Sequence, residues 1–253
     1  MRIAHISDIH CNKGNDFNPQ MFTKATKTLN TYDVDLVFIT GDLTTMGLLH
    51  EYEMAEEKLS EINGEKIIVP GNHDERNLGF KLFPEFFGQP DFIKTYSALN
   101  IVGLASSEPD KNDGHLGRGR HQLIEQGLTK NEKLTIIGFH HHVIPIPNSG
   151  RETNIIEDAG ETLDIILRNK VPLVLMGHRH VPYAVQIHNT LLVNAGTFSC
   201  TRTRAHFGNT FNIIDLEKNK IDIRVVNVGE ETEKPLICLD LEQNSCYNAL
   251  YDS

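Results

Sequence analysis

The chain has no tryptophan and only four cysteines among its 253 residues. The cysteines lie far apart, and no two of them form a C-x-x-C pair; they are Cys11, Cys200, Cys238 and Cys246. This scatter argues against a disulfide framework and against a structural zinc site, both of which need closely matched pairs. It is typical of reduced thiols in a cytoplasmic protein.

Long apolar runs are also missing. No run approaches the roughly 20 residues that a membrane span needs. The first ten residues, MRIAHISDIH, contain no long apolar segment of the kind found in secretory signals. We therefore expect a cytoplasmic protein with no membrane partner.

An excess of basic residues is absent as well. The net charge is −10, from 24 Lys and Arg against 34 Asp and Glu. Proteins that bind nucleic acid usually carry a basic surface, so this balance makes a nucleic acid an unlikely partner. It does not rule out a nuclease with a local basic patch.

Histidine, in contrast, is abundant and unevenly placed. Thirteen histidines occur, three of them in FHHH (139–142) and two in GHRH (177–180). Clusters of this kind point to metal binding or acid–base chemistry more than a uniform scatter would.

Apolar, β-branched runs alternate with helical patterns in the first two thirds of the chain. The runs predict strands at 2–6, 35–39, 65–69, 100–105, 134–139 and 171–176. The segments between them predict helices at 18–32, 49–62, 77–87, 119–130 and 157–169. This alternation indicates an α/β fold with mostly parallel strands covered by helices.

The pattern changes after residue 182. Short strands separated by turn residues predict antiparallel hairpins that form or complete a second sheet. Two packed mixed sheets flanked by helices is the expected architecture. No linker or repeat divides the chain, so we expect a single domain over residues 1–253 with the hairpins from about 183 completing the second sheet.

Five of the predicted strands end in Asp, Asn or His. Ligands of α/β sheets bind outside the carboxyl ends of the strands, where loops from distant parts of the chain meet. Two pairs, Asp8 with His10 and His178 with His180, are spaced i, i+2 and can point to a common side. The residues expected to converge are Asp8, His10, Asp42, Asn72, His140, His178 and His180.

This set offers two carboxylates, one amide and four imidazoles. One divalent ion cannot use so many side chains, whereas two ions that share one carboxylate can. Mixed oxygen and nitrogen donors suit Mn, Fe, Zn, Co or Ni better than Ca²⁺ or Mg²⁺. The sequence therefore predicts two transition-metal ions as cofactors.

The motifs that carry these residues resemble the signature blocks of the calcineurin-like metallophosphoesterases. The blocks occur in order as D-x-H (8–10), G-D (41–42), G-N-H-D (71–74), the histidines that begin at His140, and G-H-x-H (177–180). The segment VNAGTFSCTR (193–202) and the terminal hairpin resemble the smaller, cyclic-nucleotide-phosphodiesterase-like members. The family fold is a four-layer sandwich of two sheets and outer helices.

The resemblance also implies a role for each residue. Asp8, His10 and His180 would bind the first metal, and Asn72, His140 and His178 the second. Asp42 would bridge the two ions. His73 would donate a proton to the leaving group, and Asp74 would orient the ring of His73.

Two assignments stay open at this point. His140, His141 and His142 are consecutive; we choose His140 as the ligand, and either of the others could contact substrate. We expect His141 and Arg202 to bind substrate. The C-terminal hairpins could also support a homo-oligomer.

The function implied is a dinuclear metal phosphodiesterase that acts on small, nucleotide-like phosphate esters through a metal-bridging hydroxide. A phosphomonoesterase or a nuclease could use the same core. A non-catalytic scaffold would be expected to lack ligands, and here all seven donors and His73 are present.

Overall fold

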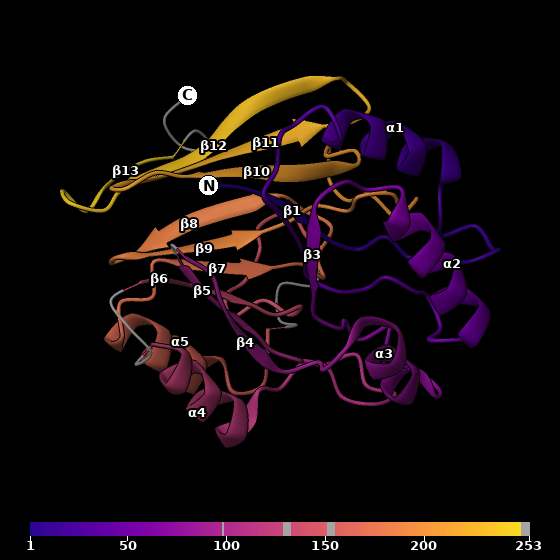
Figure 1. Cartoon of the computed structure of the whole chain (residues 1–253), viewed down its shortest axis with the longest axis horizontal. Coiled ribbons are helices and arrows are strands. Elements are labelled where there is room, and N and C mark those ends of the chain that lie inside the picture. The colour runs from indigo at the N-terminus through magenta and orange to yellow at the C-terminus, as the bar shows by residue number, and fades with distance from the viewer. Residues whose placement is uncertain (98, 129–132, 151–154, 249–253) are drawn as a thin grey trace.

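The computed structural model describes residues 1–97, 99–128, 133–150 and 155–248. Within them the chain forms two sheets and outer helices (Figure 1). The helices are α1 (Pro19–Leu29), α2 (Leu49–Ser60), α3 (Gly79–Phe87), α4 (Gly117–Leu128) and α5 (Ala159–Arg168).

The first sheet has seven strands in the order β13-β12-β11-β10-β1-β2-β3. Strands β1, β2 and β3 are parallel, and β10 joins β1 antiparallel. The strands are β1 (Arg2–Ile6), β2 (Leu36–Ile39), β3 (Glu65–Ile68), β10 (Thr210–Leu216), β11 (Lys220–Asn227), β12 (Thr232–Asp240) and β13 (Ser245–Asn248).

The second sheet has six strands in the order β4-β5-β6-β7-β9-β8. Strands β5, β6, β7 and β9 are parallel, with β4 and β8 antiparallel at the two edges. The strands are β4 (Phe92–Thr95), β5 (Leu99–Gly103), β6 (Leu134–Gly138), β7 (Leu173–Met176), β8 (Tyr183–Ile187) and β9 (Thr190–Asn194).

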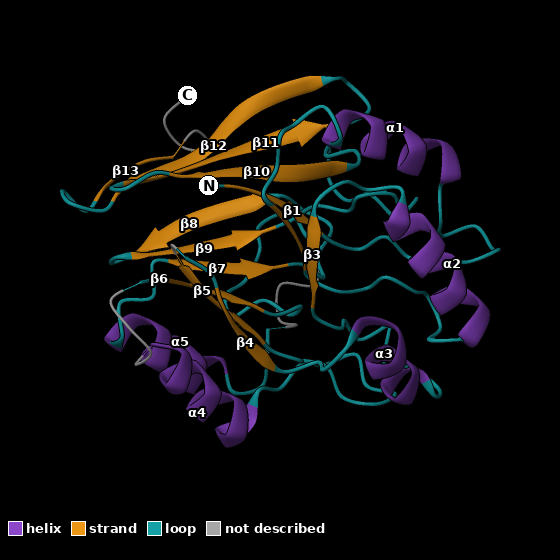
Figure 2. Ribbon diagram, viewed as in Figure 1, coloured by secondary structure: helices purple, strands orange, loops and turns teal. Residues whose placement is uncertain are grey.

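The central strands are apolar on both faces because both faces are covered. In β2, Leu36 and Phe38 face the apolar core between the two sheets, while Val37 and Ile39 face the core beneath α1, α2 and α3. A third core lies between the second sheet and helices α4 and α5. Figure 2 shows these helices on the outside of the two sheets. The predicted α/β architecture of two packed sheets with flanking helices is thus confirmed.

The expectation for the C-terminal hairpins needs a correction. Only β8 and β9 complete the second sheet, whereas β10 to β13 extend the first sheet from the free edge of β1. The register pairs Arg2 with Asp215 and His5 with Asn212. The alternating pattern predicted the strands but not which free edge each would join. The single-domain organisation stays a prediction, and the apolar core shared by both sheets favours it.

Candidate metal centre

The polar residues predicted at strand ends lie at one edge, where the carboxyl ends of the parallel strands meet. Loops from β1 and β2 are tied together there, because Asp8 N donates to Gly41 O (3.0 Å) and His10 N donates to Asp42 O (2.9 Å). The second sheet joins them through His178 N, which donates to Asp8 Oδ2 (3.1 Å). The two sheets therefore contribute to a single cluster.

The backbone at these residues is strained. Asp8, His10, Asp42, His178 and His180 all have positive φ, between 54° and 72°. Residues other than glycine adopt this left-handed conformation at a cost of about 1–3 kcal/mol each, and such outliers concentrate at functional sites. The conformation turns each side chain sharply out of its strand and towards the cluster.

Two glycines leave space that the carboxylates occupy. A Cβ added at Gly71 would lie 2.2 Å from Asp42 Oδ1, and one added at Gly177 would lie 2.1 Å from Ser7 Oγ and 3.0 Å from Asp8 Oδ2. The glycines that precede Asn72 and His178 in their motifs are therefore needed for close approach of the backbone, as the sequence suggested.

One group of donor atoms surrounds Asp8. Its Oδ1 lies 3.1 Å from His180 Nε2 and 3.8 Å from His10 Nε2. His10 Nε2 and His180 Nε2 are 3.3 Å apart, and His10 Nε2 is 3.5 Å from Asp42 Oδ2. Atoms that share one tetrahedral ion at bond lengths of about 2.1 Å lie about 3.4 Å apart, so this spacing suits a common cation.

A second group lies on the other side of Asp42. Its Oδ2 is 3.3 Å from His140 Nε2. His178 Nδ1 is 3.2 Å from His140 Nε2 and 3.0 Å from Asn72 Oδ1. Asp42 Oδ2 thus faces both groups, which is the arrangement expected of a bridging carboxylate.

Hydrogen bonds to backbone carbonyl groups orient two of the imidazoles. His140 Nδ1 donates to Thr40 O (2.6 Å), and His180 Nδ1 donates to Arg202 O (2.7 Å). With the proton on Nδ1, each ring presents an unprotonated Nε2 to the cluster. This is how a ligand histidine is usually held.

The charges of the cluster favour a bound cation. Burial would raise the pKa of Asp42, but His140 and His73 outweigh it and hold this pKa well below its usual range. Burial lowers the pKa of His140, yet the charge of Asp42 raises it to about 9. A metal ion bound here would replace the proton on His140 Nε2 and offset the charge of Asp42 in its place.

One buried oxygen of the cluster is available to a metal ion, because Asp8 Oδ1 has no hydrogen-bond partner. His178 Nε2 also lacks a partner, but it lies on the far side of the ring from Nδ1, the atom that faces His140 and Asn72. Unpaired polar atoms in a buried site cost about 1–3 kcal/mol each. Among the residues that the structure describes, three clusters of side chains could hold an ion: Asp42 with His140 and His178, His10 with Asp42 and His73, and His10 with His180 and Cys200. None of the sequence motifs includes Cys200.

His73 lies beside the cluster but is held differently. Its ring donates from Nδ1 to Thr45 O (2.7 Å), and its backbone N donates to Asp42 Oδ1 (2.9 Å). Burial lowers the pKa of His73 to about 4, against the charge of Asp42. The ring is therefore neutral at pH 7.

The expected contact between Asp74 and the His73 ring is wrong. The Asp74 carboxylate accepts hydrogen bonds from Thr44 N (2.8 Å), Thr44 Oγ1 (2.9 Å) and Gly71 N (2.9 Å). It is fully buried, and burial together with the charge of Asp42 raises its pKa to about 7. Asp74 fixes the turn that carries Asn72 and His73, while the carbonyl of Thr45 orients the ring.

The three consecutive histidines have different surroundings. His140 is the one that faces Asp42. His141 is buried, and both of its ring nitrogens are occupied, by Ser106 Oγ (2.9 Å) and Asn112 O (3.1 Å). The expectation that His141 binds substrate is therefore wrong. His142 is buried too, and neither of its ring nitrogens has a hydrogen-bond partner.

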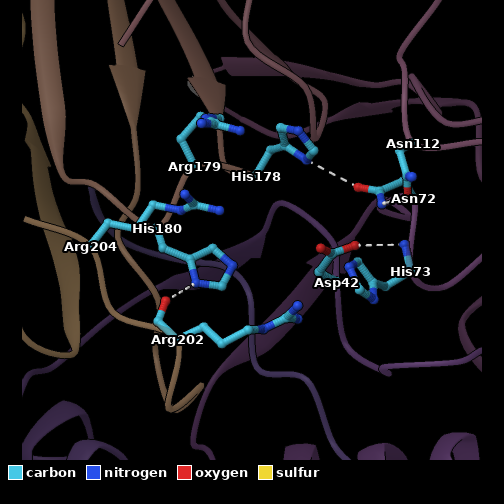
Figure 3. A pocket seen from close by; sticks show the side chains of 9 residues that line it. All are labelled: Asp42, Asn72, His73, Asn112, His178, Arg179, His180, Arg202 and Arg204. Atoms are coloured by element: carbon cyan, nitrogen blue, oxygen red, sulfur yellow. Dashed lines mark hydrogen bonds between the residues drawn. The ribbon is translucent and has the colours of Figure 1, made fainter. Parts of the chain in front are cut away.

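A cavity of about 350 Å³ opens onto the cluster. Figure 3 shows Arg202 reaching into it towards Asp42, so the structure puts this predicted residue within the cavity wall. The sequence motifs did not include Asn112, Arg179 or Arg204. The lining residues are Asp42, Asn72, His73, Asn112, His178, Arg179, His180, Arg202 and Arg204.

Comparison with known families agrees with this arrangement. Residues 1–182 match the family described as calcineurin-like phosphoesterases. The chain belongs to this family. The predicted resemblance is confirmed, and with it the prediction of a hydrolase. Members of the family use divalent metal ions, and the His and Asp clusters described above are candidate positions for them.

Curated relatives are phosphodiesterases. The chain is 26% identical over 204 residues to a protein of Coxiella burnetii named "Probable cyclic nucleotide phosphodiesterase", which covers 77% of this chain and 82% of that protein. It is also 26% identical over 204 residues to the 3',5'-cyclic-nucleotide phosphodiesterase of Nostoc sp., covering 74% of each.

Among solved structures, the purple acid phosphatase of yellow lupin has the same fold. Its TM-score is 0.71 at 15% identity, over 93% of this chain and 52% of that one. In the part of the chain that the structure describes, no helix is long and apolar enough to cross a lipid bilayer.

Proposed function

We propose that this calcineurin-like phosphoesterase is a dinuclear metal phosphodiesterase for small, nucleotide-like phosphate esters. The observation that carries the proposal is the position of Asp42 Oδ2, 3.5 Å from His10 Nε2 and 3.3 Å from His140 Nε2. One carboxylate oxygen between two groups of donors suits two ions better than one. The first ion would be held by Asp8, His10 and His180, the second by Asn72, His140 and His178.

Such a pair of ions, drawn from Mn, Fe, Zn, Co and Ni, supplies a hydroxide nucleophile at neutral pH and stabilises the charge of the phosphate. The chain's own residues position the reaction. Carbonyl groups of Thr40 and Arg202 aim two of the imidazoles, and the left-handed turns present the carboxylates. Besides the ligand side chains themselves, the protein contributes the groups that fix the orientation of these side chains.

His73 is the proposed proton donor to the leaving alcohol. Its Nδ1 proton is held by Thr45 O, so Nε2 is the atom available for transfer. The ring must first gain a proton, and burial opposes this by lowering its pKa to about 4. An anionic ester bound beside the ring would favour the charged form, which couples protonation of His73 to substrate binding.

A diester is favoured over a monoester because the relatives in the comparison carry phosphodiesterase names. The phosphomonoesterase remains the second candidate, since both reactions use the same core. The complete set of seven donors, with His73 beside them, makes a purely structural role a poor alternative. A cytoplasmic location and a homo-oligomeric state stay predictions.

The test combines metal content with a substrate panel. Metal-free protein is loaded in turn with each ion, the bound ions are counted by elemental analysis, and hydrolysis of bis(p-nitrophenyl) phosphate is compared with that of p-nitrophenyl phosphate. We expect two ions per chain and a higher kcat/KM for the diester. A single ion per chain contradicts the dinuclear centre, and preference for the monoester favours the second candidate.

A further inference from the structure

Three guanidinium groups line the cavity, and they belong to Arg179, Arg202 and Arg204. Figure 3 shows Arg179 and Arg204 on the side of His180, across from Asn72 and His73, while Arg202 reaches towards Asp42. The whole chain carries a net charge of −10, so this concentration of positive charge is local. Clefts lined by one sign of charge attract ligands of the opposite sign.

Two of these groups converge on the same neutral acceptor. Arg179 Nη2 donates to Ser149 O (2.6 Å), and Arg204 Nη1 donates to the same oxygen (3.0 Å). The Ser149 carbonyl oxygen accepts the hydrogen bond of Arg204 but carries no net charge to offset that of its guanidinium. An anion bound beside Arg204 would be attracted by this charge.

One N–H group of Arg204 is available to a ligand. Its Nε is buried and has no hydrogen-bond partner, and within residues 1–97, 99–128, 133–150 and 155–248 it forms no ion pair with a carboxylate. Arg202, in contrast, lies with Nε 3.3 Å from Asp16 Oδ1. A guanidinium with a free N–H suits the oxygens of a phosphate or carboxylate.

The charge of the proposed metal centre shows why the scissile phosphate does not need Arg204. Asp8 and Asp42 offset half of the charge of two divalent ions, and the anionic nucleophile offsets part of the rest. About one positive unit remains, which the single negative charge of a phosphodiester balances. The charge of Arg204 is then available for another group of the substrate.

We propose that Arg204 binds a second phosphate of the substrate. The substrate class is a phosphodiester that carries a further phosphate, such as a nucleotide phosphorylated at another ribose hydroxyl. This inference rests on the proposed function for the position of the scissile phosphate. It adds a determinant of specificity that the metal centre does not supply.

The test uses two ligands that differ by one phosphate, adenosine 3′-phosphate and adenosine 3′,5′-bisphosphate. Their dissociation constants are measured by calorimetry on manganese-loaded protein, without turnover. We expect the bisphosphate to bind about tenfold more tightly, since a guanidinium forms charge-assisted hydrogen bonds with the second phosphate. In Arg204→Gln the ratio should fall to about two or less.

Two further variants keep the result interpretable. Arg204→Lys retains the charge and should keep part of the preference, whereas Arg118→Gln, an exposed change on α4, should keep all of it. Melting temperatures of the variants separate loss of binding from loss of folding.

Three outcomes would overturn the inference: no preference in the unaltered protein, a preference that survives in Arg204→Gln, or equal weakening of both ligands by that change. Equal weakening would assign Arg204 to the metal-bound phosphate. Loss of the proposed function is a separate result, because it appears as absent hydrolysis of every ester while the binding ratio can still be measured.

Discussion

At the scale of single residues, the sequence identified the donors but not how their rings are held. The motifs predicted Asp8, Asp42 and His140 correctly as members of one cluster, because polar residues that follow parallel strands meet at one edge. They could not reveal that Thr45 O orients His73 or that Ser106 and Asn112 occupy His141. Such partners are backbone atoms or residues of remote loops, which leave no local pattern.

Replacing His73 tests its role directly. His73→Ala should lower kcat by roughly 10²-fold or more on an alkyl ester, whose leaving group needs a proton, and far less on a p-nitrophenyl ester. Steady-state rates on the two esters give the comparison, and His50→Ala at an exposed position is the control. Equal losses on both esters would contradict proton donation and indicate a general loss of binding.

His5 allows a prediction on acid stability. The ring is fully buried, with Nε2 3.0 Å from Thr40 Oγ1, and burial lowers its pKa to about 3. An unfolded chain would protonate His5 near pH 6.5, so between that pH and about 3 the unfolded state binds more protons. The free energy of unfolding should therefore fall with decreasing pH, by about 1.4 kcal/mol per pH unit from this residue.

Denaturant titrations across this range would measure the slope. His5→Gln, which keeps a polar group without a titrating ring, should make the slope shallower, while His50→Gln should leave it as it is. An unchanged slope in His5→Gln would show that the ring is not buried in its neutral form.

At the scale of secondary structure, helices and strands were predicted within a few residues for most of the α/β part. The six predicted strands correspond to β1, β2, β3, β5, β6 and β7. Strand β4 was missed, because Phe92–Thr95 is a short edge strand with two exposed residues and no apolar run. The free edges that β8 to β13 join are set by packing between distant segments, which alternation in sequence does not encode.

The turn after β3 offers a prediction at this scale. Gly71→Ala puts a methyl group 2.2 Å from Asp42 Oδ1, so the carboxylate or the turn must shift. We expect affinity for the metal ions to fall by at least about tenfold, since changes near metal ligands typically cost 10–100-fold. Gly119→Ala in α4, where an added Cβ meets nothing within 4 Å, is the matched control. Unchanged metal titrations in Gly71→Ala would contradict the close fit.

At the scale of the whole molecule, the centre joins the two sheets. Asp8, Asp42 and Asn72 follow strands of the first sheet, while His140, His178 and His180 follow strands of the second. The family resemblance predicted this four-layer arrangement from five short motifs. A ligand that binds donors from both sheets should stabilise the folded chain as a whole.

Metal loading should therefore raise the melting temperature. At an ion concentration about 100 times the dissociation constant, binding contributes about 2.7 kcal/mol, which corresponds to a rise of about 5–10 °C for a chain of this size. Asp42→Ala should abolish most of the rise, while Asp164→Ala, at a carboxylate 68% exposed, should not. Scanning calorimetry with and without a chelator measures both. A rise that survives in Asp42→Ala would contradict a bridging role.

The pairing of β1 with β10 constrains when the centre can form during biosynthesis. The loop that carries Asp8 is synthesised before residues 197–216, yet Thr197 Oγ1 donates to Asp8 O, Phe198 N donates to Ser7 O, and β10 supplies the neighbouring strand. A nascent chain that ends before these segments lacks the hydrogen bonds that hold the loop of Asp8. Cation uptake is therefore a late event, confined to polypeptides whose synthesis has passed the tenth strand.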